Sequence, residues 1–168
     1  MKKVVILVVL CSLFVAGCSV KKTEELTDAE RFANEYSISS NNPFCYTTLN
    51  NLLELLEQDE SFILFVGNSD SEWSSLGAKA LNRALKEEKV DKVYYFSPGS
   101  IKNKQSKKYK SLKDVLDYKK SNLPIVYIIQ DGEVIDYVDY SVHENSSIDD
   151  SSIRQLKKEY IDLVSEYL

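Results

Sequence analysis

The apolar run Phe62-Ile63-Leu64-Phe65-Val66 is the feature of this sequence that most constrains its fold. Five consecutive apolar residues between turn-forming residues are typical of a strand that is buried on both faces. Successive side chains of a strand point to opposite sides, so such a strand needs an apolar layer on each side. We therefore expect this segment to lie inside a sheet that helices cover on both faces.

Helical and extended patterns alternate along the rest of the chain. Thr27 and Glu30 have the spacing of a capping box, Ser111 is expected to cap a later helix, and Asp131-Gly132 predicts a tight hairpin. The expected helices between successive strands would act as crossover connections, which favour mostly parallel pairing of the earlier strands. The predicted class is α/β, with a mixed, mostly parallel sheet, helices on both faces and an additional N-terminal helix. The expected helices are 27–36, 48–58, 71–89, one from Ser111 and 152–167, and the expected strands are 44–47, 62–66, 93–96, 125–130 and 133–140.

The N-terminus has the form of a secretion signal. Lys2 and Lys3 precede an apolar run that ends in Val15-Ala16-Gly17-Cys18, and the run is shorter than the roughly 20 residues that span a bilayer. The last four residues resemble the lipobox of bacterial lipoproteins. The resemblance implies that residues 1–17 are removed and that Cys18 carries a lipid, which anchors the protein on the extracytoplasmic face of the membrane. The alternative is an ordinary secretory signal in which Cys18 is incidental.

The expected organisation is a signal peptide (1–17), a lipidated tether with the N-terminal helix (18–43) and one domain (44–168). The net charge of −5 becomes −7 once Lys2 and Lys3 are removed. An acidic chain is a poor match for nucleic acid or for anionic lipid, so we expect no nucleic-acid partner and anchorage through the lipid alone.

We expect a solvated surface where lysines concentrate, at Lys102, Lys104, Lys107, Lys108 and Lys110.

Signal removal and lipidation would leave Cys45 as the last free cysteine, so no intramolecular disulfide is expected. Cys45 can be a buried apolar residue, a reactive thiol or an intermolecular link; its aromatic neighbours Phe44 and Tyr46 favour burial.

The single histidine, His143, lies in a polar stretch, and no Cys/His spacing indicates a metal. We predict no metal and no cofactor.

Residues 62–74 and 124–138 resemble a thioredoxin fold, in which a central strand leads to a Cys-x-x-Cys motif at the start of a helix. A cis-proline and a glycine-turn hairpin follow later in that fold. The chain is similar to thioredoxin-like lipoproteins and bacteriocin-accessory proteins of Gram-positive bacteria. The matching segments are Asn42-Pro43-Phe44-Cys45-Tyr46, Phe65-Val66-Gly67, Ser71-Glu72-Trp73-Ser74 and Leu123-Pro124.

The departure from the family pattern decides the expected function. Ser71 and Ser74 stand where the family has cysteines, and a hydroxyl cannot replace a thiolate in disulfide exchange. A serine hydrolase would need a base, and the only histidine is far away in sequence. The likeness implies that Trp73, Leu123 and Pro124 border a groove for a protein or peptide; Trp73 is equally interpretable as an edge of the core.

We therefore predict a redox-inactive binding protein of unknown partner rather than an enzyme. Two alternatives stay open: a weak monothiol oxidoreductase that uses Cys45, and an accessory or structural protein of the cell envelope.

Overall fold

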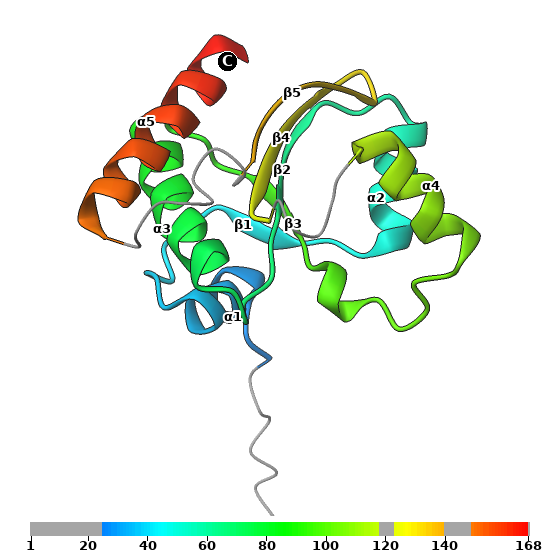
Figure 1. The fold of residues 1–168 in the computed structure, drawn as a ribbon, viewed down its shortest axis with the longest axis horizontal. Helices are drawn as coiled ribbons and strands as arrows, with labels where there is room; N and C mark the ends of the chain where they lie inside the picture. Colours follow the sequence, from blue (N-terminus) through cyan, green and yellow to red (C-terminus); the bar gives the residue numbers. More distant parts are fainter. Residues whose placement is uncertain (1–24, 118–122, 140–148, 168) are drawn as a thin grey trace, which may run out of the picture.

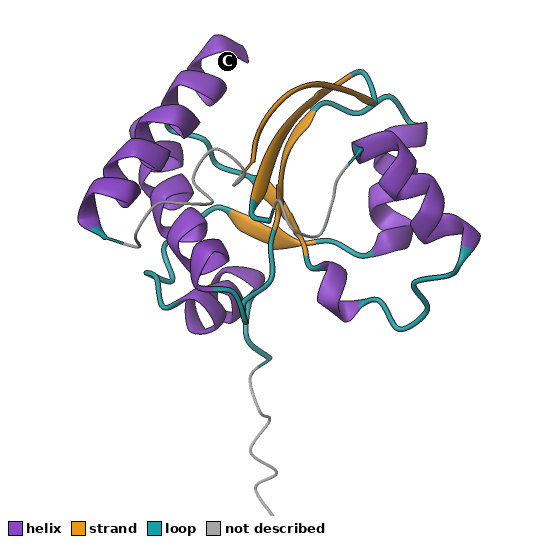
Figure 2. Cartoon of the chain, in the orientation of Figure 1, coloured by secondary structure: helices purple, strands orange, loops and turns teal. Residues whose placement is uncertain are grey.

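In a computed structural model that describes residues 25–117, 123–139 and 149–167, a single five-stranded sheet lies between two groups of helices (Figures 1 and 2). The strands lie in the order β1-β3-β2-β4-β5. β1 and β2 each pair with β3 in parallel, whereas β4 pairs antiparallel with both β2 and β5. The strands are β1 (Phe44–Tyr46), β2 (Phe62–Val66), β3 (Val93–Phe96), β4 (Ile125–Gln130) and β5 (Glu133–Asp139).

The helices divide between the two faces of this sheet (Figure 1). One face carries α1 (Asp28–Tyr36), α3 (Glu72–Glu87) and α5 (Asp150–Tyr167), and the other carries α2 (Leu49–Glu57) and α4 (Lys107–Leu116). A short 3-10 helix, η1 (Pro98–Ser100), links β3 to α4. This arrangement confirms the predicted α/β class with helices on both faces of a mixed sheet, and it is compatible with a thioredoxin-like fold.

The central strand β2 contributes to both apolar cores, as the unbroken run of apolar residues predicts. Phe65 packs into the core formed with α1, α3 and α5, whereas Leu64 and Val66 pack into the core formed with α2 and α4. All three side chains are fully buried. The alternation of faces along the strand explains why consecutive residues here are all apolar.

The N-terminal helix α1 is part of the folded core. Both hydrogen bonds of its capping box are present, between Thr27 and Glu30, so the predicted helix start is confirmed. Phe32 and Tyr36 are fully buried, and the Phe32 ring stacks on Phe44 of β1 with 3.9 Å between centroids. The helix that follows the expected tether is therefore fixed to the edge of the sheet.

The start of α4 differs from the prediction. The helix begins at Lys107 and is capped by Ser106, whose hydroxyl accepts a hydrogen bond from the amide of Tyr109, so Ser111 lies inside the helix. Tyr109 is buried beside Leu112 and supplies an apolar turn that the lysine-rich sequence obscures. Lys107, Lys108 and Lys110 are therefore helical, and their side chains are exposed, as predicted.

The hairpin between β4 and β5 turns at Asp131 and Gly132, which both have positive φ angles, of 49° and 73°. This is the backbone that a two-residue turn between antiparallel strands requires, and the prediction from the Asp-Gly pair is confirmed. A bulge at Ile128/Ile129 shifts the register of β5. Burial still alternates from one residue to the next along most of β5.

Two regions of functional interest lie outside the described residues: the N-terminal 24 residues, which include Cys18, and residues 140–148, which include His143. Within the ranges that the structure describes, no helix combines the length and the apolar character that crossing a membrane requires.

Candidate functional site

The loop between β2 and α3 holds the positions where the resemblance places redox cysteines. Ser71 is the N-cap of α3, and its hydroxyl accepts a hydrogen bond from the amide of Ser74, with 3.3 Å between the nitrogen and oxygen atoms. The amide of Ser71 donates in turn to the carbonyl of Asn68, at 2.9 Å. Ser71 therefore caps the helix with its side chain, as serine commonly does.

Ser74 has a different role in the same turn. Its side chain is fully buried, and its hydroxyl accepts a hydrogen bond from the backbone amide of Asn68 at 3.1 Å. This bond connects the loop that follows β2 to the first turn of α3. Because Ser74 is out of contact with solvent, its hydroxyl cannot meet an external substrate.

Glu72 and Trp73 occupy the first turn of α3. Glu72 is exposed, and Trp73 is partly buried and packs against the core formed with α1, α3 and α5. The indole therefore serves as an edge of the core, one of its two expected roles. Its remaining exposure leaves part of the side chain at the surface for contact with a ligand.

Pro124 lies beside the second turn of the same helix. The Leu123–Pro124 peptide bond is cis, the form that the resemblance implies. The proline ring lies so close to Gly77 that a Cβ at position 77 would be 2.6 Å from Pro124 Cγ. The structure thus brings the proline segment to the helix that Ser71 caps. Leu123 points to the other side of the sheet and packs into the core formed with α2 and α4.

Cys45 is not part of this arrangement. It lies on β1, an edge strand that β3 and β2 separate from β4. Its side chain is partly buried rather than fully buried. Burial raises the pKa of the Cys45 thiol, and nearby Lys92 opposes this shift. A raised thiol pKa lowers the fraction of thiolate, which is the reactive form.

A group of tyrosines near Gly67 was not anticipated from the sequence. Tyr36 of α1 donates a hydrogen bond to the hydroxyl of Tyr95 on β3 at 2.9 Å, and Tyr95 donates to Glu35, also at 2.9 Å. Tyr46 of β1 donates to the same carboxylate. Burial raises the pKa of Tyr36 well above its ordinary value. The three tyrosines come from separate elements, so no spacing along the chain reveals the group.

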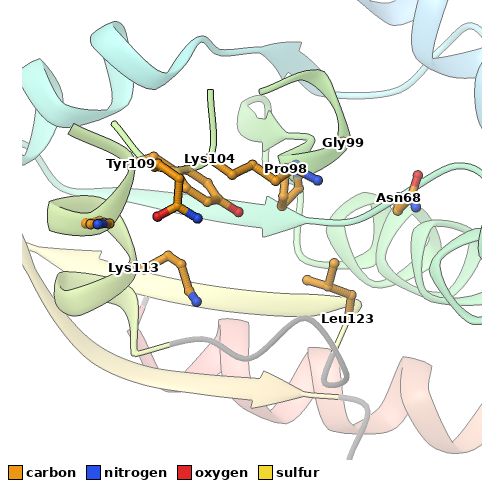
Figure 3. A pocket seen from close by; sticks show the side chains of 9 residues that line it. Asn68, Pro98, Gly99, Lys104, Tyr109, Lys113 and Leu123 are labelled. Atoms are coloured by element: carbon orange, nitrogen blue, oxygen red, sulfur yellow. The ribbon is translucent and has the colours of Figure 1, made fainter. Parts of the chain in front are cut away.

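A pocket of about 490 Å³ opens between the β2–α3 loop, η1 and α4 (Figure 3). We name it the lysine pocket because Lys104, Lys110 and Lys113 line it, and no acidic residue of the described ranges does so. Figure 3 shows the Tyr109 and Lys113 side chains on the α4 side and Leu123 at the opposite end. The remaining lining residues are Asn68, Pro98, Gly99 and Gln105.

The fold is that of an α/β protein compatible with a thioredoxin-like architecture, and serines stand at the positions where the resemblance places redox cysteines. The chain matches no protein-family model, and no curated protein shows a significant similarity to it. Within the described ranges, no group of three His, Cys, Asp or Glu side chains could hold a metal ion.

Proposed function

We propose that this chain is a lipid-anchored extracytoplasmic protein whose thioredoxin-like domain lacks thiol redox activity and binds a protein or an extended peptide. The anchor is the diacylglycerol on Cys18, and its support is the likeness of Val15-Ala16-Gly17-Cys18 to a lipobox. Several acyl chains hold a protein on a membrane stably, whereas one does so only marginally.

The observation that carries the loss of redox activity is the pair of serines at the start of α3. Disulfide exchange requires a thiolate to attack and a second sulfur to resolve the mixed disulfide. Ser71 uses its oxygen to cap the helix, and the buried Ser74 uses its oxygen to hold the amide of Asn68. Both hydroxyls therefore have structural roles, and neither can form a disulfide.

The proposed binding surface lies beside these serines and includes Trp73, Leu123 and Pro124. The paired registers of β4 with β2 and β5 begin at Ile125, so the backbone of Leu123 and Pro124 lies beyond both ladders. Extended peptides bind such segments by strand addition, which depends on backbone hydrogen bonds and on pockets for side chains. This mode of binding needs no cysteine.

Cys45 offers little support for the alternative of a monothiol oxidoreductase. Its raised pKa disfavours the thiolate, and the edge strand β1 holds it away from the proline segment. Binding is therefore the function that the arrangement supports best.

Photo-crosslinking of the full chain in its membrane tests the proposed surface. A benzophenone amino acid at position 73 is expected to capture a discrete partner, whereas the same probe at Lys86 is not. Lys86 is exposed at the other end of α3, about 20 Å away along the helix axis. A second probe at the exposed Glu72 tests the same surface if the substitution at position 73 prevents folding. Equal capture at Lys86, or no capture at positions 72 and 73, would remove this surface from the proposal.

A further inference from the structure

We infer that the lysine pocket binds carboxylate side chains of the peptide that lies along Leu123 and Pro124, so that the protein selects acidic extended segments. This inference rests on the proposed function and specifies the chemistry of its ligand. It depends on three observations: the local charge, the separation of lysines around α4, and the position of Leu123.

The local charge around the pocket is opposite to that of the whole chain. The chain has a net charge of −5, yet residues 92–113 contain no aspartate or glutamate and seven lysines. Three of these lysines line one pocket, and no acidic side chain of the described residues lines it with them. A cavity lined by charges of one sign concentrates ligands of the opposite sign.

The lysines of α4 divide between two surroundings. Lys107 and Lys108 lie beside α2 in a depression that also contains Glu54 and Glu57, and the Lys108 ammonium donates to Asn50 at 2.8 Å. These two cations have acidic neighbours within the protein. By contrast, no described carboxylate lines the pocket that contains Lys104 and Lys110, and neither lysine takes part in an ion pair between described residues. Lys104 and Lys110 therefore remain available for an external anion.

The position of Leu123 connects this pocket to the proposed peptide surface. Leu123 lines the pocket and immediately precedes Pro124. The ring of Pro124 packs against Gly77 of α3. A peptide beside this segment would therefore extend one side chain toward Lys113 and Lys104. Alternate side chains of an extended peptide point the same way, which favours acidic residues at every second position. Asn68, Gln105 and Tyr109 add polar groups, and the volume of about 490 Å³ accommodates a side chain of this size.

The test uses the full chain in detergent micelles and two labelled decapeptides. One peptide alternates valine with glutamate, and the other alternates valine with glutamine. We expect the acidic peptide to bind about ten-fold more tightly, a modest preference because exposed ion pairs contribute little individually. The preference should diminish when sodium chloride rises from about 0.05 M to about 0.5 M, since salt screens exposed charges.

Two triple variants with equal loss of charge locate the effect. Lys104→Gln, Lys110→Gln and Lys113→Gln together should abolish the preference for the acidic peptide. The control combines Lys102→Gln, Lys107→Gln and Lys108→Gln, which do not line the pocket, and should retain the preference. Equal loss in both triple variants would indicate general electrostatic attraction and would overturn the inference.

The remaining outcomes separate this inference from the proposed function. If both peptides bind equally and Trp73→Ala weakens both, the peptide surface stands and the carboxylate pocket fails. If neither peptide binds while crosslinking at position 73 still captures a partner, the pocket again fails and the proposed function stands. Displacement of the acidic peptide by inorganic phosphate, but not by chloride of equal ionic strength, would assign the pocket to phosphoryl groups and overturn the inference.

Discussion

Pro124 lies directly against Gly77, so that a Cβ atom at position 77 would be 2.6 Å from Pro124 Cγ and 3.2 Å from the Tyr160 hydroxyl oxygen. Gly77 stands in the middle of α3, where glycine costs about 1 kcal/mol relative to alanine. The close approach of the proline ring explains why the helix has glycine at this position.

Gly77→Ala should therefore destabilise the protein despite the better helix propensity of alanine. Crowding in a packed core costs about 1–3 kcal/mol, so we expect a net loss of about 1 kcal/mol in the free energy of unfolding. Urea denaturation measures this change, and Lys79→Ala on the same helix serves as the control. An increase in the stability of Gly77→Ala would contradict the contact between α3 and Pro124.

Introducing cysteines at both serine positions tests the redox interpretation. In Ser71→Cys/Ser74→Cys, in a Cys45→Ser background, the two thiols would lie at the N-cap and in the first turn of α3. The positive end of a helix stabilises a thiolate, so we expect an intramolecular disulfide and reduction of insulin, a reaction that we expect the wild-type chain not to catalyse. Each single variant is a control and should show no turnover. A double variant that stays reduced under an oxidising buffer would contradict thioredoxin-like geometry at this loop.

The main strand, helix and turn positions could be predicted from the sequence because its strongest patterns are local. The apolar run of Phe62–Val66, the Thr27–Glu30 capping box and the Asp131-Gly132 turn each depend on neighbouring residues, and the structure has all three. The start of α4 was misplaced because Tyr109 is its first buried residue. A single tyrosine among lysines gives little periodicity to recognise.

The site was less accessible to sequence reasoning because its parts meet only through tertiary packing. The bond from the Asn68 amide to the buried Ser74 hydroxyl depends on how the loop folds back, which no local pattern indicates. The lysine pocket combines residues from the β2–α3 loop, η1, α4 and the segment before β4. In sequence those lysines indicate only a charged surface.

The buried hydroxyl of Tyr36 should make the stability of the protein fall at high pH. Burial raises the pKa of Tyr36 in the folded state, so the neutral phenol is favoured there. This contribution is complete below the pKa of the unfolded chain, about 10, and is lost as the pH rises beyond it. Burial likewise raises the pKa values of Tyr127 and Tyr160, so unfolding titrations above about pH 10 should show a steep decline.

Tyr36→Phe should reduce that decline while lowering stability near neutral pH. The variant loses the hydrogen bond from Tyr36 to Tyr95, a cost of about 1 kcal/mol. Chemical denaturation at several pH values measures both effects, and Tyr137→Phe is the control because its ring is 55% exposed. An unchanged slope above about pH 10 would show that Tyr36 does not contribute to the alkaline loss of stability.

Cys18→Ala should abolish lipidation and membrane retention. The proposed thioether to diacylglycerol requires the sulfur of Cys18, so the variant should incorporate no labelled palmitate and should leave the detergent phase on phase separation. Cys11→Ala is the matched control, since Leu10 before it is large and does not fit the small-residue pattern of a lipobox. Palmitate labelling that survives Cys18→Ala but not Cys11→Ala would move the anchor to Cys11.

Cys45 should react slowly with alkylating reagents in the native protein. Its thiol is partly buried, and burial raises its pKa, so less thiolate is present near neutral pH than for a free cysteine. We expect labelling by iodoacetamide to be slower than that of a cysteine introduced at the exposed position Ser165, and to accelerate as the pH rises past the usual range of thiol ionisation. The positive charge of Lys92 partly offsets this rise in the pKa of Cys45. Lys92→Gln removes that charge and should therefore slow the reaction further. Labelling as fast as at position 165 near neutral pH would restore the thiol-based alternative for this protein.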